Sequence, residues 1–265
     1  MSHSRSGNSS GSFITFLIPF LLIVGVVIYV VYQDKKRKKA LNDFCIRNGM
    51  TYQDKVITLP STAQRFAIVN LGAERTISSV MSGTRNNIKF YIFEVTSEQL
   101  NSSQGSRNRK HNACLGHTVC LMINTQTRFP SFYLRDSSDK LPKTFQFLGM
   151  EIPVPNPYNL GIDILNPDKK YEKKGGKNIE LTDYPDFCSD FVLKGCNEEE
   201  VYQYFTPERI NAFMDNHQPG YQYEAKEDCF MVSKPYVTDL DGRLDLFKKS
   251  MVIYNSLIST PNNPT

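Results

Sequence analysis

A run of twenty uncharged residues, followed at once by a basic cluster, constrains this chain more than any other feature. The run reads FITFLIPFLLIVGVVIYVVY and extends from Phe13 to Tyr32. At 1.5 Å per residue, a helix of this length spans about 30 Å, which matches the hydrocarbon core of a bilayer. Tyr29 and Tyr32 lie at its charged end, where amphipathic rings favour the headgroup level. The run therefore predicts a transmembrane helix over residues 13–32.

The charges on the two sides of this run predict its orientation. The basic residues that follow it are Lys35, Lys36, Arg37, Lys38 and Lys39. The leader of residues 1–12 carries Arg5 alone. Because Lys and Arg are retained on the cytoplasmic side, we expect the leader outside and the C-terminal part in the cytoplasm, at a plasma or inner membrane. The five basic side chains are then predicted to lie against the anionic membrane surface.

The run does not resemble a cleavable signal peptide, whose apolar region is shorter and ends at a small-residue cleavage site.

The remaining chain divides into a basic juxtamembrane helix over residues 33–49, which ends at Asn48-Gly49, and one domain over residues 50–265. In the helix, Ala40, Leu41, Phe44 and Cys45 recur at helical spacing, and this apolar stripe is predicted to pack on the domain.

The composition of the domain excludes one class of function. Residues 50–265 carry 24 Lys and Arg against 25 Asp and Glu, so this part is close to neutral. Nucleic-acid-binding domains depend on clustered cations. We therefore expect the bilayer and an unidentified protein as partners, and no nucleic acid.

The six cysteines admit two interpretations. In the cytoplasm they are expected to be reduced thiols. If the domain were instead exported, they would pair as disulfides, and the sequences that begin at Asn8 and Asn101 would be glycosylation sites. This alternative requires the basic cluster to face outward, against the charge rule.

The order of the expected elements predicts an α+β fold. Strand-like runs begin at RFAIVNLG near Phe66 and continue to SFYLRD, with a hairpin turn at GTRNN, which predicts an antiparallel meander. A long proline-rich loop is expected over residues 136–187. The C-terminal part reads as strand, helix, hairpin and helix. Asn197, with Glu200 three residues on, is expected to cap the helix that follows the strand. In the last helix, an apolar stripe is predicted at Leu240, Leu244, Phe247, Met251, Tyr254 and Ile258.

The motifs in this layout resemble those of a group of uncharacterised bacterial proteins. They are the single N-terminal span with its basic flank, FCIRNGMTY, PSFYLRD, DFCSDFVLKGCNEEEVYQYFTPERI and the final FMVSKP strand. The resemblance implies a membrane-anchored protein with a cytoplasmic domain of unknown function, and it implies no activity.

The strongest candidate for a metal site is HNACLGHTVC, which places His111, Cys114, His117 and Cys120 at intervals of three. Both ligand types suit zinc. If the segment is a strand, however, His117 and Cys120 point to opposite faces and cannot share one ion. We therefore expect no metal and no cofactor.

The chain contains no nucleophile elbow, zinc-protease helix motif or phosphate-binding loop. The sequence thus favours a single-pass membrane protein whose cytoplasmic domain is a binding or scaffolding module without catalysis. The alternative is a membrane-tethered enzyme of unrecognised class, with a pocket near residues 136–187.

Overall fold

The computed structural model describes residues 10–55, 59–70, 74–99, 113–137, 144–147, 150–153, 167–235 and 239–259. The side chains of some residues at the edges of these ranges lie outside the description, among them 10–17, 19, 98–99, 113–115 and 144–153. The described helices are α1 (Ser10–Arg47), α2 (Pro167–Glu172), α3 (Pro185–Asp190), α4 (Glu198–Tyr204), α5 (Pro207–Asn216) and α6 (Leu240–Ser259), with short 3-10 helices η1 (Ala63–Arg65) and η2 (Ile68–Asn70).

The described strands form one nine-stranded antiparallel sheet in the order β1-β2-β3-β4-β11-β10-β5-β9-β8, and a separate β6-β7 hairpin. Their bounds are β1 (Thr51–Lys55), β2 (Glu74–Arg85), β3 (Ile88–Gln99), β4 (Ala113–Ile123), β5 (Phe129–Asp136), β6 (Thr144–Phe147), β7 (Met150–Pro153), β8 (Lys177–Asn178), β9 (Phe191–Gly195), β10 (Gln222–Glu227) and β11 (Cys229–Pro235). The predicted α+β class is confirmed, and so is an antiparallel meander for β2, β3 and β4. Strand β5, which was expected to end this meander, pairs with β10 and β9 instead.

One hairpin turn and one helix cap form as their sequences predict. Asn86 and Asn87 join β2 to β3 with φ of 50° and 64°, the two positive values that a tight type I′ hairpin requires. Asn197 caps α4, because its side chain accepts a hydrogen bond from the backbone N–H of Glu200.

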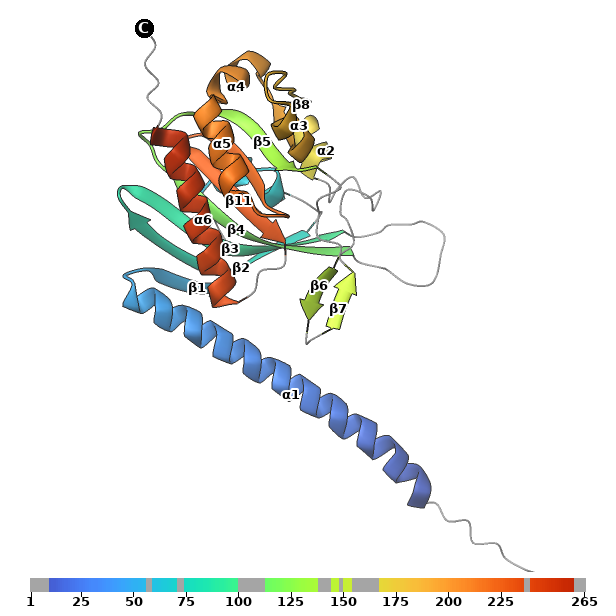
Figure 1. Ribbon diagram of the computed structural model, residues 1–265. Coiled ribbons are helices and arrows are strands. Elements are labelled where there is room, and N and C mark those ends of the chain that lie inside the picture. Colours follow the sequence, from blue (N-terminus) through green and yellow to red (C-terminus); the bar gives the residue numbers. More distant parts are fainter. Residues whose placement is uncertain are drawn as a thin grey trace, which may run out of the picture.

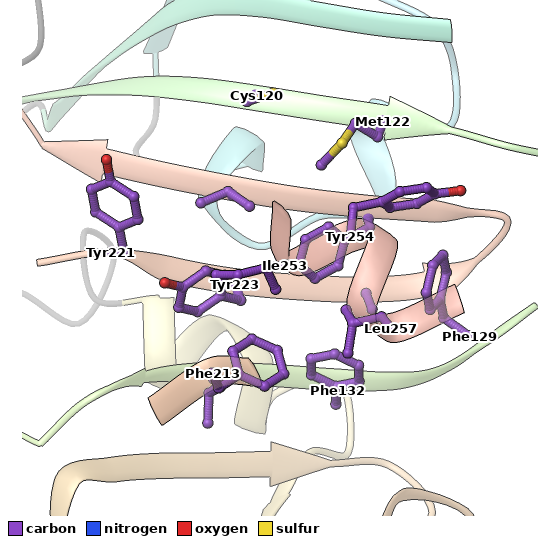
Figure 2. Packing of buried hydrophobic residues seen from close by; sticks show 14 of the residues in the cluster. Cys120, Met122, Phe129, Phe132, Phe213, Tyr221, Tyr223, Ile253, Tyr254 and Leu257 are labelled. Carbon is purple, nitrogen blue, oxygen red and sulfur yellow. The ribbon is translucent and has the colours of Figure 1, made fainter. Parts of the chain in front are cut away.

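The main core lies between one face of the sheet and helices α5 and α6. Figure 2 shows Phe213 of α5 and Tyr254 and Leu257 of α6 among the sheet residues Phe132 and Tyr223. A second apolar cluster lies on the opposite face, where the η1–η2 segment covers the centre of the sheet.

Helix α1 runs without interruption from Ser10 to Arg47, and Figure 1 shows its N-terminal part projecting away from the body of the protein. The separate helices predicted over residues 13–32 and 33–49 are therefore one. Among the residues described, no helix is both long enough and apolar enough to cross a membrane. The predicted span of residues 13–32 begins with residues whose side chains are not described, so this span stays a prediction.

Two expected local structures are wrong, and one strand was not expected. The segment RFAIVNLG forms η1, η2 and their connection instead of a strand. Residues 136–187 are not loop throughout, since they hold the β6-β7 hairpin, α2 and β8. Strand β1 has too few apolar residues to show as a strand, because it pairs with β2 at the edge of the sheet.

The buried face of α6 also differs from the predicted stripe. Of the predicted stripe, Tyr254 is fully buried and Leu240, Phe247 and Met251 are partly buried against the main core, whereas Leu244 is half-buried and Ile258 is exposed. The other buried residues of α6 are Arg243, Leu246, Ser250, Ile253 and Leu257. The hydrophobic pattern misplaced this face because Arg243 and Ser250 are polar and yet belong to the core.

Candidate functional site

The C-terminal part of α1 joins the domain through apolar packing, which is accompanied by buried polar contacts. The C-terminal part of α1 contacts β1, β2 and α6. Leu41 and Cys45 are fully buried in the main core, and Phe44 packs against it. Burial raises the pKa of the Cys45 thiol to about 11, so this cysteine is a neutral packing residue. The predicted packing of this face on the domain is confirmed.

The end of α1 has the hydrogen bonds of a Schellman motif. The N–H of Met50 donates to the carbonyl of Cys45 at 2.9 Å, and the N–H of Gly49 donates to that of Ile46 at 3.3 Å. Gly49 has φ of 65°, which suits glycine at this position. The predicted stop at Asn48-Gly49 is confirmed, and it turns the chain directly into β1.

Beside this contact, two guanidinium groups converge on one carboxylate. Arg243 of α6 is fully buried and pairs with Glu94 of β3, and Arg37 of α1 donates to the same carboxylate at 3.1 Å. Ser78 donates its hydroxyl to the other oxygen of Glu94 at 3.3 Å. Burial lowers the pKa of Arg243, an effect that the Glu94 carboxylate opposes. Glu94 therefore joins three elements, α1, β3 and α6.

A β-bulge in β2 supplies the remaining acceptor for Arg243. The register with β3 shifts between Ser78 and Met81, and Ser79 has φ of 53° within the bulge. The Ser79 carbonyl accepts a hydrogen bond from Nη1 of Arg243 at 2.8 Å. Bulges redirect backbone groups in this way, and here the redirected carbonyl binds one nitrogen of a buried cation whose Nε has no hydrogen-bond partner in the described part of the chain.

The five basic residues after the predicted span have two different environments. The three exposed ones are Lys35, Lys36 and Lys39. The other two are partly buried: Arg37 binds Glu94 and Asp34, and Lys38 lies 2.8 Å from Asp34 and 3.0 Å from Asp54 of β1. Two of the residues predicted to contact the membrane thus make ion pairs within the protein.

A groove of about 460 Å³ lies beside this junction, between the end of α1, the β2-β3 hairpin and α6. Its lining residues are Phe44, Asn48, Gly49, Met50, Thr84, Arg85, Phe90, Ile92, Leu244, Phe247 and Lys248. A second hollow of about 470 Å³ is lined by residues of the 178–193 segment, next to the expected loop of residues 136–187. Its polar lining residues among those the structure describes are Asn178, Glu180, Thr182, Cys188 and Ser189, and the Cys188 thiol donates to the Leu181 carbonyl.

Comparison with known proteins does not assign a family. No known protein family matches the chain, and no curated protein matches it by sequence. The fold was compared with solved structures, and one that is similar is the crystal structure of the mycobacterial trehalose monomycolate transport factor A. The two share 10% sequence identity with a TM-score of 0.48, over 87% of this chain and 97% of the other. A likeness at this level carries no conclusion about what the present chain binds.

The candidate zinc ligands are not brought together where the structure describes them. His117 lies on the β4 face that carries Val119 and Leu121, whereas Cys120 belongs to the main core on the opposite face. His111 and the side chain of Cys114 lie outside the described residues. Among the described residues, no group of three or more His, Cys, Asp or Glu side chains is arranged to hold a metal ion. Burial lowers the pKa of His117 to about 4, which keeps the ring neutral at pH 7.

Sequence reasoning missed Glu94 and Arg243. Lys89 lies in the same segment as Glu94, IKFYIFEVT, and two aspartates accompany Arg243 in LDGRLDLF. Because other charges lie within a few positions of both residues, neither segment shows which charge is buried and paired.

Two further buried polar groups fix parts of the domain. The carboxylate of Glu224 accepts the N–H of Ala67 at 2.8 and 3.0 Å, which holds the η1–η2 segment on the sheet. Burial raises the pKa of Glu224 to about 7. Asp136 at the end of β5 pairs with His217 and accepts the N–H of Gly220 at 2.5 Å. The other ring nitrogen of His217 lies 3.3 Å from the Tyr223 hydroxyl, so no Ser or Cys nucleophile is bound to it in the described region.

Proposed function

We propose that this chain is a single-pass membrane protein, with its N-terminus outside and its C-terminal domain in the cytoplasm, whose domain is a binding or scaffolding module held close to the bilayer. The proposal is carried by one observation. A single helix, α1, is apolar and exposed over Ile18 to Tyr32 and then becomes part of the core of the domain at Leu41 and Cys45.

The exposed part of α1 has the chemistry of a lipid-facing helix. Its large apolar side chains from Ile18 to Tyr32 are about half or more exposed all around the helix, and the domain does not cover them. Burial of one such side chain is worth about 1.5–3 kcal/mol. A dozen of them left in water would outweigh the net stability of a typical domain, and a bilayer relieves this cost.

The junction makes the proposed tether rigid. From Tyr32 to Leu41 the helix rises about 14 Å, without a break at which the domain would pivot. The Glu94 carboxylate and the Lys38–Asp54 ion pair fix the same helix to β3, α6 and β1. A flexible linker would allow the domain to change its distance and orientation relative to the membrane. A continuous helix instead holds one face of the domain at a fixed distance from it. Such a property suits a scaffold.

Protease protection tests the topology. The full chain carries one tag at each end and is expressed in a bacterium, and intact cells and spheroplasts are treated with protease. We expect the C-terminal tag to survive until the membrane is permeabilised and the protein to resist extraction with alkaline carbonate. Digestion of the C-terminal tag from outside would support the exported alternative instead, and extraction by carbonate would contradict the anchor itself.

A further inference from the structure

The junction groove has walls that an apolar chain would fill. Phe90 and Phe247 lie with ring centroids 4.6 Å apart, and Phe44, Leu244 and Met50 are half-buried beside them. Leu244 and Phe247 belong to the apolar stripe of α6 that the sequence places in the core. In the structure they face the groove, because the polar residues Arg243 and Ser250 occupy the buried side of the helix.

The charged residues that line the groove are all cationic. Arg85 lies on the β2-β3 hairpin and Lys248 on α6, and both side chains are exposed. Among the described residues that line the groove there is no Asp or Glu, and in this part of the chain neither cation has an ion-pair partner. An apolar cleft that carries cationic side chains is complementary to an amphiphile with an anionic head.

The size of the groove separates a small ligand from a protein partner. Its volume of about 460 Å³ lies within the range of about 300–1,000 Å³ that is typical of small-molecule sites. It is lined by eleven residues, whereas a stable protein interface engages roughly 20–30 residues on each side. A lipid with two acyl chains and a large headgroup also exceeds what these few side chains enclose.

We propose that the junction groove binds a single-chain fatty acid, with the acyl chain against Phe44, Phe90 and Phe247 and the carboxylate at Arg85 and Lys248. Binding itself depends only on the groove. The bilayer as the source of the ligand rests on the proposed function. A fatty acid in this position contacts α1, the hairpin and α6 together, so it would tighten the same junction that fixes the domain to its anchor.

The test uses the full chain in nanodiscs of phosphatidylcholine and a dodecanoate that carries a photoreactive diazirine. After illumination, labelled peptides are mapped by mass spectrometry. We expect labelling in two places: the apolar part of α1, which reports contact with the bilayer, and the peptides that contain Phe44 to Met50 and Leu244 to Lys248. Excess dodecanoate should compete at the groove, whereas dodecanol and dodecylammonium should not.

Three variants make the result specific. Arg85→Glu combined with Lys248→Glu should reduce groove labelling at least about tenfold, because both charge-assisted contacts become repulsive. Leu244→Trp, at a half-buried lining position of α6, should block the groove and give a similar loss. Lys89→Glu is the matched control, since Lys89 is exposed on the opposite face of the same hairpin, and it should leave labelling unchanged.

Several outcomes would overturn the proposal. Groove peptides that stay unlabelled while α1 is labelled contradict fatty-acid binding and leave the anchor intact. Equal competition by dodecanol shows that the head charge is not recognised. If the groove is unlabelled and Leu244→Trp converts a dimer to a monomer in light scattering, the groove is an interface between copies of the chain. Failure of the chain to enter nanodiscs contradicts the proposed function, and groove labelling is then measured in detergent-free buffer.

Discussion

Arg243 of α6 is completely buried and pairs with Glu94 of β3, residues that lie 149 positions apart in the chain. The same carboxylate also binds Arg37 of α1, so one side chain of the sheet connects α6 to α1. Removal of one member of a buried pair leaves a charge without compensation, and this cost exceeds that of losing a surface pair. Substitutions at this junction should therefore show which residues stabilise the domain and which affect its proposed attachment to the membrane.

Replacement of Glu94 should expose the cost of leaving Arg243 unpaired. We expect Glu94→Gln to lower the free energy of unfolding by about 3–5 kcal/mol, and the added change Arg243→Met to recover part of this loss. Urea denaturation of the two single variants and the double variant gives the coupling energy, which should exceed about 1 kcal/mol. The exposed pair Lys249–Asp245 on the same helix is the control, with a coupling of about 0.3–0.5 kcal/mol. Additive effects at Glu94 and Arg243 would contradict the network.

Leu41 should contribute to the stability of the domain although it belongs to α1, the helix that we propose as the membrane anchor. Leu41→Ala removes a fully buried side chain and is expected to cost about 2–5 kcal/mol of unfolding free energy. Ile46→Ala, five residues further along α1, removes a side chain that is 67% exposed and should cost less than about 0.5 kcal/mol. The combined replacement of Leu41 and Phe44 by Ser should likewise lower the thermal midpoint of a fragment of residues 38–265. An unchanged midpoint would mean that this part of α1 is only a linker.

The exposed lysines and the buried basic residues should affect different properties. Replacement of Lys35, Lys36 and Lys39 by Gln should leave the unfolding free energy within about 0.5 kcal/mol of the parent, because these side chains are exposed. It should increase the fraction of chains with the C-terminus outside, since orientation depends on the balance of Lys and Arg. Arg37→Gln should instead lower stability and leave orientation unchanged. Protease protection and thermal unfolding measure the two effects on the same samples.

The buried carboxyl group of Glu224 should make stability depend on pH. Its pKa of about 7 in the folded protein exceeds the ordinary value of 4.5, so the folded state holds the extra proton between these two pH values. The contribution to stability is complete below pH 4.5 and is lost as the pH rises toward 7. At about 1.4 kcal/mol per pKa unit, this loss amounts to roughly 3 kcal/mol.

Glu224→Gln removes this titration while an amide oxygen remains to accept the Ala67 N–H. The variant should therefore gain stability relative to the parent as the pH is raised from 5 to 8, and then run parallel to it. Urea denaturation across this range provides the measurement, with the exposed Glu180→Gln as control. A difference between parent and Glu224→Gln that does not change with pH would show that Glu224 is ionised throughout.

Local and periodic features of this protein followed from the sequence by itself. The α+β class, the Asn86-Asn87 hairpin, the Asn197 cap and the end of α1 at Gly49 were predicted correctly, because each depends on residues within a few positions of one another. The assignment of His117 and Cys120 to opposite faces of a strand held for the same reason.

The site at the junction was decided by tertiary structure alone. Glu94, Arg37 and Arg243 come from three distant segments, and only the packing of α6 and α1 on the sheet brings their charges together. The same packing turns Arg243 inward and Phe247 toward the groove, which reverses what hydrophobicity predicts for α6. A hydrophobic pattern ranks each side chain by its own transfer free energy, whereas a buried ion pair is stable only through a partner whose position the pattern does not contain.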